Sequence, residues 1–171
     1  DGVLINSEQN MSYAWSQTCK KLKLKISFNK YKKYVGLGFF EILNKLKVKK
    51  KYHNDAFIHY NFYSKRKINK IKLFPNVRQV LTKIKYNYKI ALFTSKNKSR
   101  VKKITSNLNL SFSKVVTLED VVKPKPSPEG LKKIINDFNF KKREIFYVGD
   151  TLHDLQAAKL AKINYIQCNW G

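Results

Sequence analysis

The sequence predicts an α/β fold, because short apolar runs that suit buried strands are followed by segments that suit helices. Residues 145–148 form one such run, which ends at Gly149, and residues 155–161 beyond it are rich in leucine and alanine, which favour a helix. Residues 89–93 form another run, and a helical pattern follows over 99–108. A chain of 171 residues can bury a real core, as one domain or as one domain with an insert.

Residues 9 to about 72 predict a different, all-helical region. Apolar residues recur there at helical spacing, and only Val35-Gly36-Leu37-Gly38 interrupts the pattern. Residues 55–60 indicate a third helix, after two whose apolar positions are Met11, Ala14, Trp15, Thr18 and Leu22, and then Phe39, Ile42, Leu43 and Leu46. We therefore expect a helical insert ahead of the α/β units.

The α/β pattern resumes at residue 73. Pro75 favours a turn and Asn76 suits a helix cap, and the apolar face of the helix that follows comes from Val77, Val80, Leu81 and Ile84. The remaining expected elements are a strand at 114–116, a helix at 129–135 with prolines before it, and a strand at 165–168.

Two carboxylates lie at the strand-to-helix turn that follows residues 145–148. Asp150 and Asp154 are four residues apart, at the place where open α/β sheets bind their ligands. Oxygen ligands of this kind suit a hard divalent cation such as Mg²⁺. The alternative is that both residues only cap and charge the first turn of the helix.

Four short motifs occur in order along the chain and favour the first interpretation. They are Asp-Gly-Val-Leu-Ile-Asn-Ser-Glu at 1–8, Leu-Phe-Thr-Ser-Lys at 92–96, Lys-Pro-Lys-Pro-Ser-Pro at 123–128 and Val-Gly-Asp-Thr-Leu-His-Asp at 148–154. Together they resemble the four motifs of haloacid-dehalogenase-like phosphohydrolases. The most similar branch contains phosphoglycolate phosphatase and β-phosphoglucomutase.

The resemblance implies a Rossmann-like parallel sheet core with an inserted α-helical cap. The core would comprise residues 1–8 and 73–171, and the cap residues 9–72. In this family the central strand of the sheet precedes the first motif, so the given chain should lack it. We expect the cap to close over the site and to contact the organic part of the substrate.

The first family motif has two aspartates, and Asp1 matches the second. The nucleophile would then lie two positions upstream of Asp1, so residues 1–171 alone should show no turnover. Asp1 would protonate the leaving alkoxide and then activate water, and its main-chain carbonyl would bind the metal.

The other motifs imply a phosphate pocket and a metal site. Thr94 and Ser95 would bind the phosphoryl group together with the N-terminus of the next helix. Lys123 would offset negative charge in the transition state, whereas Lys125 would point elsewhere. The metal ligands would be Asp1, Asp150 and Asp154, with Asp154 acting through water or by orienting Lys123.

The predicted function is that of a Mg²⁺-dependent phosphomonoester hydrolase that acts through an aspartyl phosphate on a small phosphorylated metabolite. A phosphosugar mutase of the same family fits the motifs equally. A non-enzymatic nucleic-acid-binding protein is the alternative of another class, since the net charge is +25. A third alternative is that the chain is a remnant with no function.

Composition weakens the nucleic-acid interpretation. The abundant residues Lys, Asn, Ile, Tyr and Phe all have A/T-rich codons, and the lysines are spread along the chain, so we expect a solvated basic surface. No apolar run approaches the ~20 residues that a bilayer requires. Cys19 and Cys168 lack metal-ligand spacing, and free thiols favour a reducing, cytoplasmic location.

Overall fold

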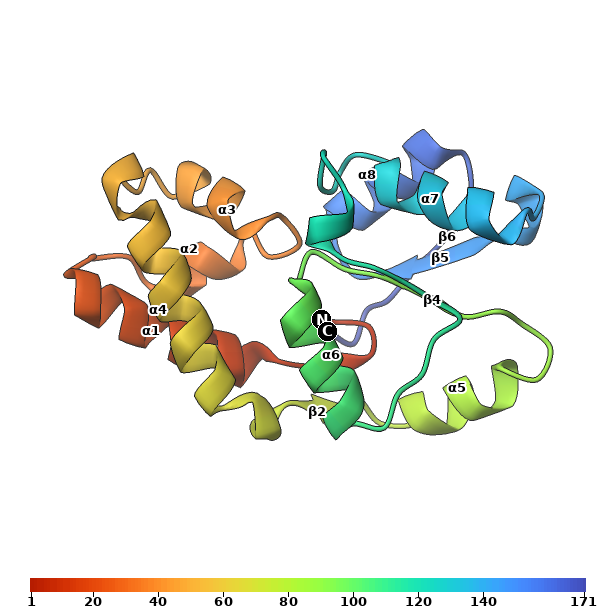
Figure 1. Ribbon diagram of the computed structural model, residues 1–171, viewed down its shortest axis with the longest axis horizontal. Coiled ribbons are helices and arrows are strands. Elements are labelled where there is room, and N and C mark those ends of the chain that lie inside the picture. The colour runs from red at the N-terminus through yellow and green to blue at the C-terminus, as the bar shows by residue number, and fades with distance from the viewer.

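The computed structural model describes all 171 residues as two lobes that lie side by side (Figure 1). We call residues 8–70 the helical lobe and the rest of the chain the α/β lobe. None of the helices has both the length and the apolar character needed to cross a bilayer.

The helical lobe is built around α1 and α4, which pack along each other. Buried aromatic rings fill its core, and Trp15 stacks on Tyr31 with 4.5 Å between ring centroids. The predicted third helix is longer than the 55–60 segment that indicated it. The elements are α1 (Glu8–Leu22), α2 (Phe28–Lys32), α3 (Phe39–Lys45) and α4 (His53–Arg66), with 3₁₀ turns at Lys50–Tyr52 and Ile68–Lys70.

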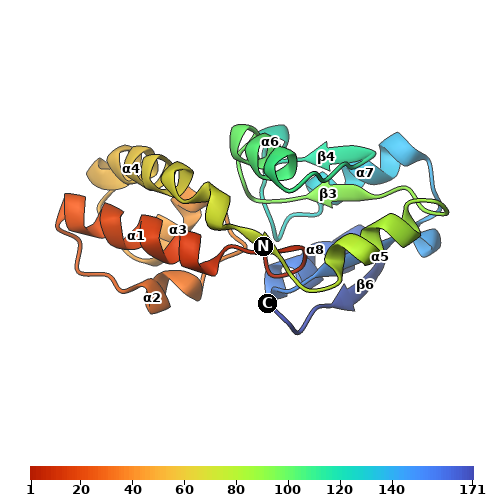
Figure 2. The same ribbon diagram turned by 90° about the horizontal axis from the view of Figure 1, so that it is seen from below.

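The α/β lobe alternates strands and helices, as the sequence predicts. Its elements are β1 (Ile5–Asn6), β2 (Lys72–Leu73), α5 (Val77–Ile84), β3 (Ala91–Phe93), α6 (Lys98–Asn107), β4 (Lys114–Val116), α7 (Glu129–Phe138), β5 (Phe146–Gly149), α8 (Leu152–Ala161) and β6 (Asn164–Gln167). Short 3₁₀ turns occur at Leu118–Asp120 and Lys142–Glu144. Figure 2 shows α6 beside the β3–β4 pair.

The strands pair two by two. β3 is parallel to β4, with Phe93 opposite Val116, and β5 is parallel to β6, with Val148 opposite Ile166. No strand pairing joins these two pairs, so the predicted parallel sheet is discontinuous. β1 and β2 form a separate antiparallel pair where the chain leaves and re-enters the α/β lobe.

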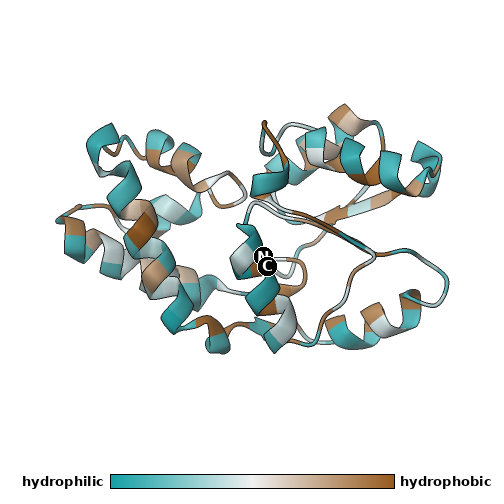
Figure 3. Ribbon diagram, viewed as in Figure 1, coloured by the Kyte–Doolittle hydropathy of each residue, from teal (hydrophilic) through white to brown (hydrophobic).

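Helices α7 and α8 hold the two parallel pairs together. One buried cluster combines Phe93 of β3 and Val116 of β4 with side chains of both helices: Leu131, Ile134, Ala157 and Ala161. Because the strands carry the motif loops at their carboxyl ends, this packing sets where those loops meet. Figure 3 shows that hydrophilic residues cover the outer faces of most helices, as expected for a solvated basic surface.

Gly130, near the start of α7, touches this cluster. A Cβ atom at Gly130 would lie 2.3 Å from Cε2 of Phe93. Alanine favours a helix over glycine by about 1 kcal/mol, but overpacking costs about 1–3 kcal/mol. We therefore expect Gly130→Ala to lower the free energy of unfolding by about 1 kcal/mol in urea denaturation.

The control for this prediction is the same substitution in a Phe93→Leu background, where the clash is relieved. There Gly130→Ala should be neutral or stabilising. Equal destabilisation in both backgrounds would contradict the packing argument.

Candidate active site

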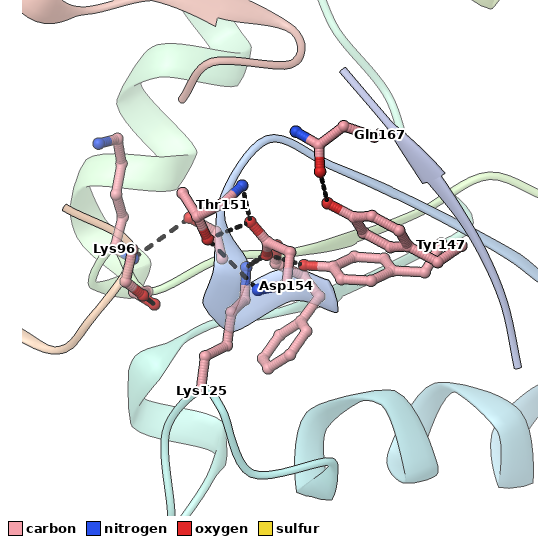
Figure 4. Close-up of polar contacts among 11 residues, drawn as sticks. Lys96, Lys125, Tyr147, Thr151, Asp154 and Gln167 are labelled. Atoms are coloured by element: carbon pink, nitrogen blue, oxygen red, sulfur yellow. Dashed lines mark hydrogen bonds and ion pairs between the residues drawn. The ribbon is translucent and has the colours of Figure 1, made fainter. Parts of the chain in front are cut away.

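The site lies where the carboxyl ends of β3 and β5 face the loop before α7. Thr94 directly follows β3, Asp150 directly follows β5, and Asp154 lies in the first turn of α8. Figure 4 shows Lys125 reaching Asp154 from the loop that precedes α7. Loops that are distant in sequence therefore meet at one point.

A buried ion pair joins two of these loops. Nζ of Lys125 lies 2.8 Å from Oδ1 of Asp154, and the two side chains are only 8% and 5% exposed. The same ammonium is 3.4 Å from the carbonyl oxygen of Phe93 and lies over the Phe93 ring, 4.6 Å from its centroid. This lysine thereby ties the α7 loop to the end of β3 as well as to α8.

The carboxylate of Asp154 is saturated with donors. Oδ1 accepts hydrogen bonds from Lys125 and from the hydroxyl of Tyr147 at 2.6 Å, while Oδ2 accepts from the backbone and the hydroxyl of Thr151 at 3.1 and 2.6 Å. The Thr151 hydroxyl in turn accepts from the Asp154 N–H, which completes a capping box at the start of α8. Burial alone would raise the pKa of Asp154, but Lys125 and these hydrogen bonds lower it to about 2.

Because every acceptor position on Asp154 is taken, the structure does not support it as a direct metal ligand. It acts instead as the group that orients a lysine and begins a helix. That lysine is Lys125, so the expectation that Asp154 orients Lys123 is wrong.

Lys123 does not lie in the site. It is exposed, and its backbone N–H donates to Oε2 of Glu129 at 2.9 Å. The expectation that Lys125 points elsewhere is therefore also wrong. Both lysines precede a proline in Lys-Pro-Lys-Pro, so the sequence pattern fits either register, and only the packing against Phe93 and Asp154 separates them.

Asp1 is held by two partners. Its Oδ2 forms an ion pair with Nζ of Lys96, and its Oδ1 accepts a hydrogen bond from the hydroxyl of Ser7. Burial lowers the pKa of Lys96 well below its usual range, and the charges of Arg100 and Lys125 lower it further. The Leu-Phe-Thr-Ser-Lys motif ends at Lys96, but nothing in the sequence pattern separates this lysine from the many others.

Asp150 differs from the other two aspartates because its carboxylate accepts no hydrogen bond from another residue. It packs against the backbone of Gly2, where a Cβ would lie 1.8 Å from Oδ2, so only glycine permits this approach. Burial raises the pKa of Asp150, the positive amino group of Asp1 partly offsets this, and the charge of Asp154 raises it further. Because no other residue donates a hydrogen bond to this carboxylate, its oxygens remain available to a divalent cation.

Side chains alone do not complete such a cation site. No group of three or more His, Cys, Asp or Glu side chains is arranged to hold a metal. The donors that fit are the Asp150 carboxylate and the main-chain carbonyl of Asp1, with water completing a Mg²⁺ shell. The three-aspartate set expected from the sequence is thus reduced to these two residues.

Thr94 and Ser95 lie at the end of β3, as expected. The hydroxyl of Thr94 accepts from the N–H of Lys96 at 3.2 Å and keeps its own proton for another acceptor. The hydroxyl of Ser95 donates to the carbonyl oxygen of Gly36 at 2.6 Å, so it links the α/β lobe to the helical lobe. Its proton is not available to a phosphate, contrary to its expected role.

We expect Lys125→Met to lower the free energy of unfolding by about 3–5 kcal/mol, because it leaves the buried Asp154 carboxylate without its cation. The matched change Lys123→Met, two positions away on the surface, should alter it by no more than about 0.5 kcal/mol. Urea denaturation at pH 7 measures both. Equal effects would mean that the lysine pair is assigned the wrong way round.

The lowered pKa of Asp154 also predicts a pH dependence. Its folded-state pKa of about 2 is below the ordinary value of 3.8, so it stabilises the fold above that value and loses the contribution as the pH falls toward 2. The stability difference between the wild type and Asp154→Asn should therefore shrink by about 2 kcal/mol from pH 5 to pH 2. Asp137→Asn, at an exposed ion pair, is the control. A constant difference across this range would contradict the assignment.

Known proteins are similar to this chain along most of its length. Residues 1–168 match the model of the haloacid dehalogenase-like hydrolase family. Phosphoglycolate phosphatase of Aquifex aeolicus is 28% identical over 176 residues, covering 100% of this chain and 82% of the relative. Phosphoglycolate phosphatase of Yersinia pestis is 32% identical over 120 residues, covering 68% of this chain and 51% of the relative, and pyrophosphatase PpaX of Bacillus mycoides is 34% identical over 88 residues, covering 50% and 41%.

Solved structures agree on the fold. A hydrolase from Pseudomonas syringae superposes with a TM-score of 0.88 at 20% identity, covering 98% of this chain and 80% of that one. A haloacid dehalogenase-like family protein from Streptococcus pneumoniae gives 0.86 at 21% identity, covering 100% and 82%. Because the family model spans nearly the whole chain and the motif loops meet at one site, the chain belongs to the haloacid dehalogenase-like hydrolase family.

Proposed function

We propose that the protein is a Mg²⁺-dependent phosphomonoester hydrolase, similar to phosphoglycolate phosphatase, that acts through an aspartyl phosphate. The observation that carries the proposal is the convergence of Asp1, Asp150 and Asp154 with the buried Lys125 and the half-buried Lys96 at the strand ends. Carboxylates for proton transfer and metal binding, with ammonium groups that offset phosphate charge, are what phosphoryl transfer to a carboxylate requires.

The nucleophile in this proposal is an aspartate two positions upstream of Asp1. Its carboxylate oxygen bonds to phosphorus while the ester P–O bond breaks, and the leaving alkoxide takes a proton from Asp1. Asp1, now ionised, removes a proton from water, which attacks phosphorus and releases phosphate from the acyl link. Lys96 holds Asp1 in place through its ion pair, and Ser7 fixes the other oxygen.

The remaining residues bind charge and position the phosphate. Lys125 offsets the negative charge that gathers at the strand ends, and Asp154 fixes its position. The Thr94 hydroxyl offers a donor to the phosphoryl oxygens, whereas the backbone N–H groups of Lys98 and Arg100 at the start of α6 already donate to Glu119 and Asn97. Asp150 and the Asp1 carbonyl would hold Mg²⁺, which when bound neutralises phosphate charge.

The helical lobe is proposed to act as the cap, since its Gly36 carbonyl meets Ser95 beside the site. The substrate would be a small phosphorylated metabolite, and two free buried thiols suit a reducing cytoplasm. A phosphosugar mutase would use the same residues. The geometry favours neither over the other, and hydrolysis is proposed because the curated relatives are named as phosphatases and a pyrophosphatase.

Mg²⁺-dependent binding of inorganic phosphate to residues 1–171, measured by calorimetry, tests the site. Asp150→Asn should weaken Mg²⁺ binding by at least about tenfold, since even outer-shell partners of a metal contribute that much. Asp137→Asn, which removes an exposed acid on α7, should leave it unchanged.

If Asp150→Asn binds Mg²⁺ as tightly as the wild type, the proposed metal site is wrong. Turnover gives a second test. A chain that carries the upstream aspartate should release phosphate from p-nitrophenyl phosphate with Mg²⁺, and residues 1–171 alone should not.

A further inference from the structure

One buried arginine is not used by the chemistry above. Arg100 lies in the first turn of α6, is 7% exposed, and extends from the α/β lobe into the helical lobe. Its Nη2 donates to Oδ1 of Asn10 on α1 at 2.6 Å, and the guanidinium lies over the ring of Tyr60 on α4, 5.7 Å from the centroid. It therefore lies where the two lobes meet.

This guanidinium has no carboxylate partner, and none of the five ion pairs in the protein includes it. Its Nε is buried without a hydrogen bond, and Nη2 alone is bonded to the protein. Asn10, which occupies the position of a counter-ion, is uncharged and is fixed by its own bond to the carbonyl oxygen of Ser64 at 2.8 Å. A buried cation left in this state is unfavourable unless an anion arrives from outside.

The position of Arg100 indicates where such an anion would come from. Its backbone N–H donates to the Asn97 side chain that caps α6, the helix that follows the Thr94 loop of the proposed site. Its charge also acts on Lys96, which is paired with Asp1 in the proposed site. An anion near Arg100 would therefore lie close to the phosphate, on the side of the helical lobe.

We propose that Arg100 is a specificity residue that binds a second anionic group of the substrate, a carboxylate on the organic part of a small phosphate ester. This inference rests on the proposed function. A guanidinium pairs well with a planar carboxylate through charge-assisted hydrogen bonds. The free Nη1 is the donor available for this contact, while Asn10 and Tyr60 hold the group in place.

The test compares two ligands of similar size by calorimetry with Mg²⁺ present. Phosphoglycolate carries the carboxylate, and ethyl phosphate carries an uncharged methyl group in its place. We expect residues 1–171 to bind phosphoglycolate about tenfold more tightly, since a hydrogen bond to a charged group contributes this much. Arg100→Gln should bring the ratio close to one while the affinity for ethyl phosphate is kept.

A second variant separates recognition from a structural role. Asn10→Asp keeps Arg100 but supplies an internal carboxylate at the position of Oδ1, so it should also remove the preference for phosphoglycolate. Arg66→Gln, which removes one positive charge from the exposed end of α4, should retain the full preference. This control separates a local contact from the general effect of net charge.

The outcomes can be told apart. If neither ligand nor inorganic phosphate binds, the proposed function fails and the inference fails with it. If both esters bind the wild type equally, or if Arg100→Gln and Asn10→Asp retain the preference, the role of Arg100 is overturned while the phosphate site stands.

Discussion

The arrangement of the α/β lobe depends on one buried contact, the ion pair between Lys125 and Asp154. The carboxylate begins α8 through its capping box with Thr151 and also accepts the hydroxyl of Tyr147 from β5, so it fixes a strand and a helix relative to each other. The ammonium reaches the end of β3 at the carbonyl of Phe93. No strand pairing joins the β3–β4 pair to the β5–β6 pair, so this pair is the polar link between the two halves, beside the apolar packing of α7 and α8. A buried ion pair contributes little net stability, but removing one partner is strongly destabilising because the other charge is left buried and unpaired. The pair therefore favours the one arrangement of the loops in which both partners meet.

Much of the fold follows from local patterns in the sequence. The run at 145–148 and the glycine after it predict β5 within one residue, and the small-residue segment beyond predicts α8, which begins three residues before the expected 155. The expectation that this strand is buried is only partly met, since Phe146 and Val148 are exposed. β3 and α6 are predicted within two residues, whereas α7 continues three residues beyond its expected end at 135. The motif loops are also predicted correctly as a group, since the carboxyl ends of strands meet at one edge of an open sheet.

Individual roles within the loops were harder to predict, and the errors have a common cause. Lys123 and Lys125 both precede proline, and Ser95 follows Thr94, so spacing alone does not say which side chain turns inward. That choice depends on contacts with residues far away in the sequence: Asp154 for Lys125, and Gly36 for Ser95. Asp154 illustrates the same limit, because its four hydrogen bonds remove it from the metal ligands that its position in the motif suggests.

Charge gives the strongest reason to treat the lobe junction as part of the site. The chain has 36 basic and only 11 acidic residues, yet three of those acids, Asp1, Asp150 and Asp154, gather in one place with Lys96 and Lys125. Two of the three acids there pair with a lysine, while Arg100 nearby has only the neutral Asn10. In a chain with so many exposed lysines, burying an additional cation without an acid is unfavourable for folding alone. We therefore infer that the anion opposite Arg100 comes from outside the protein, and that it is a group of the substrate.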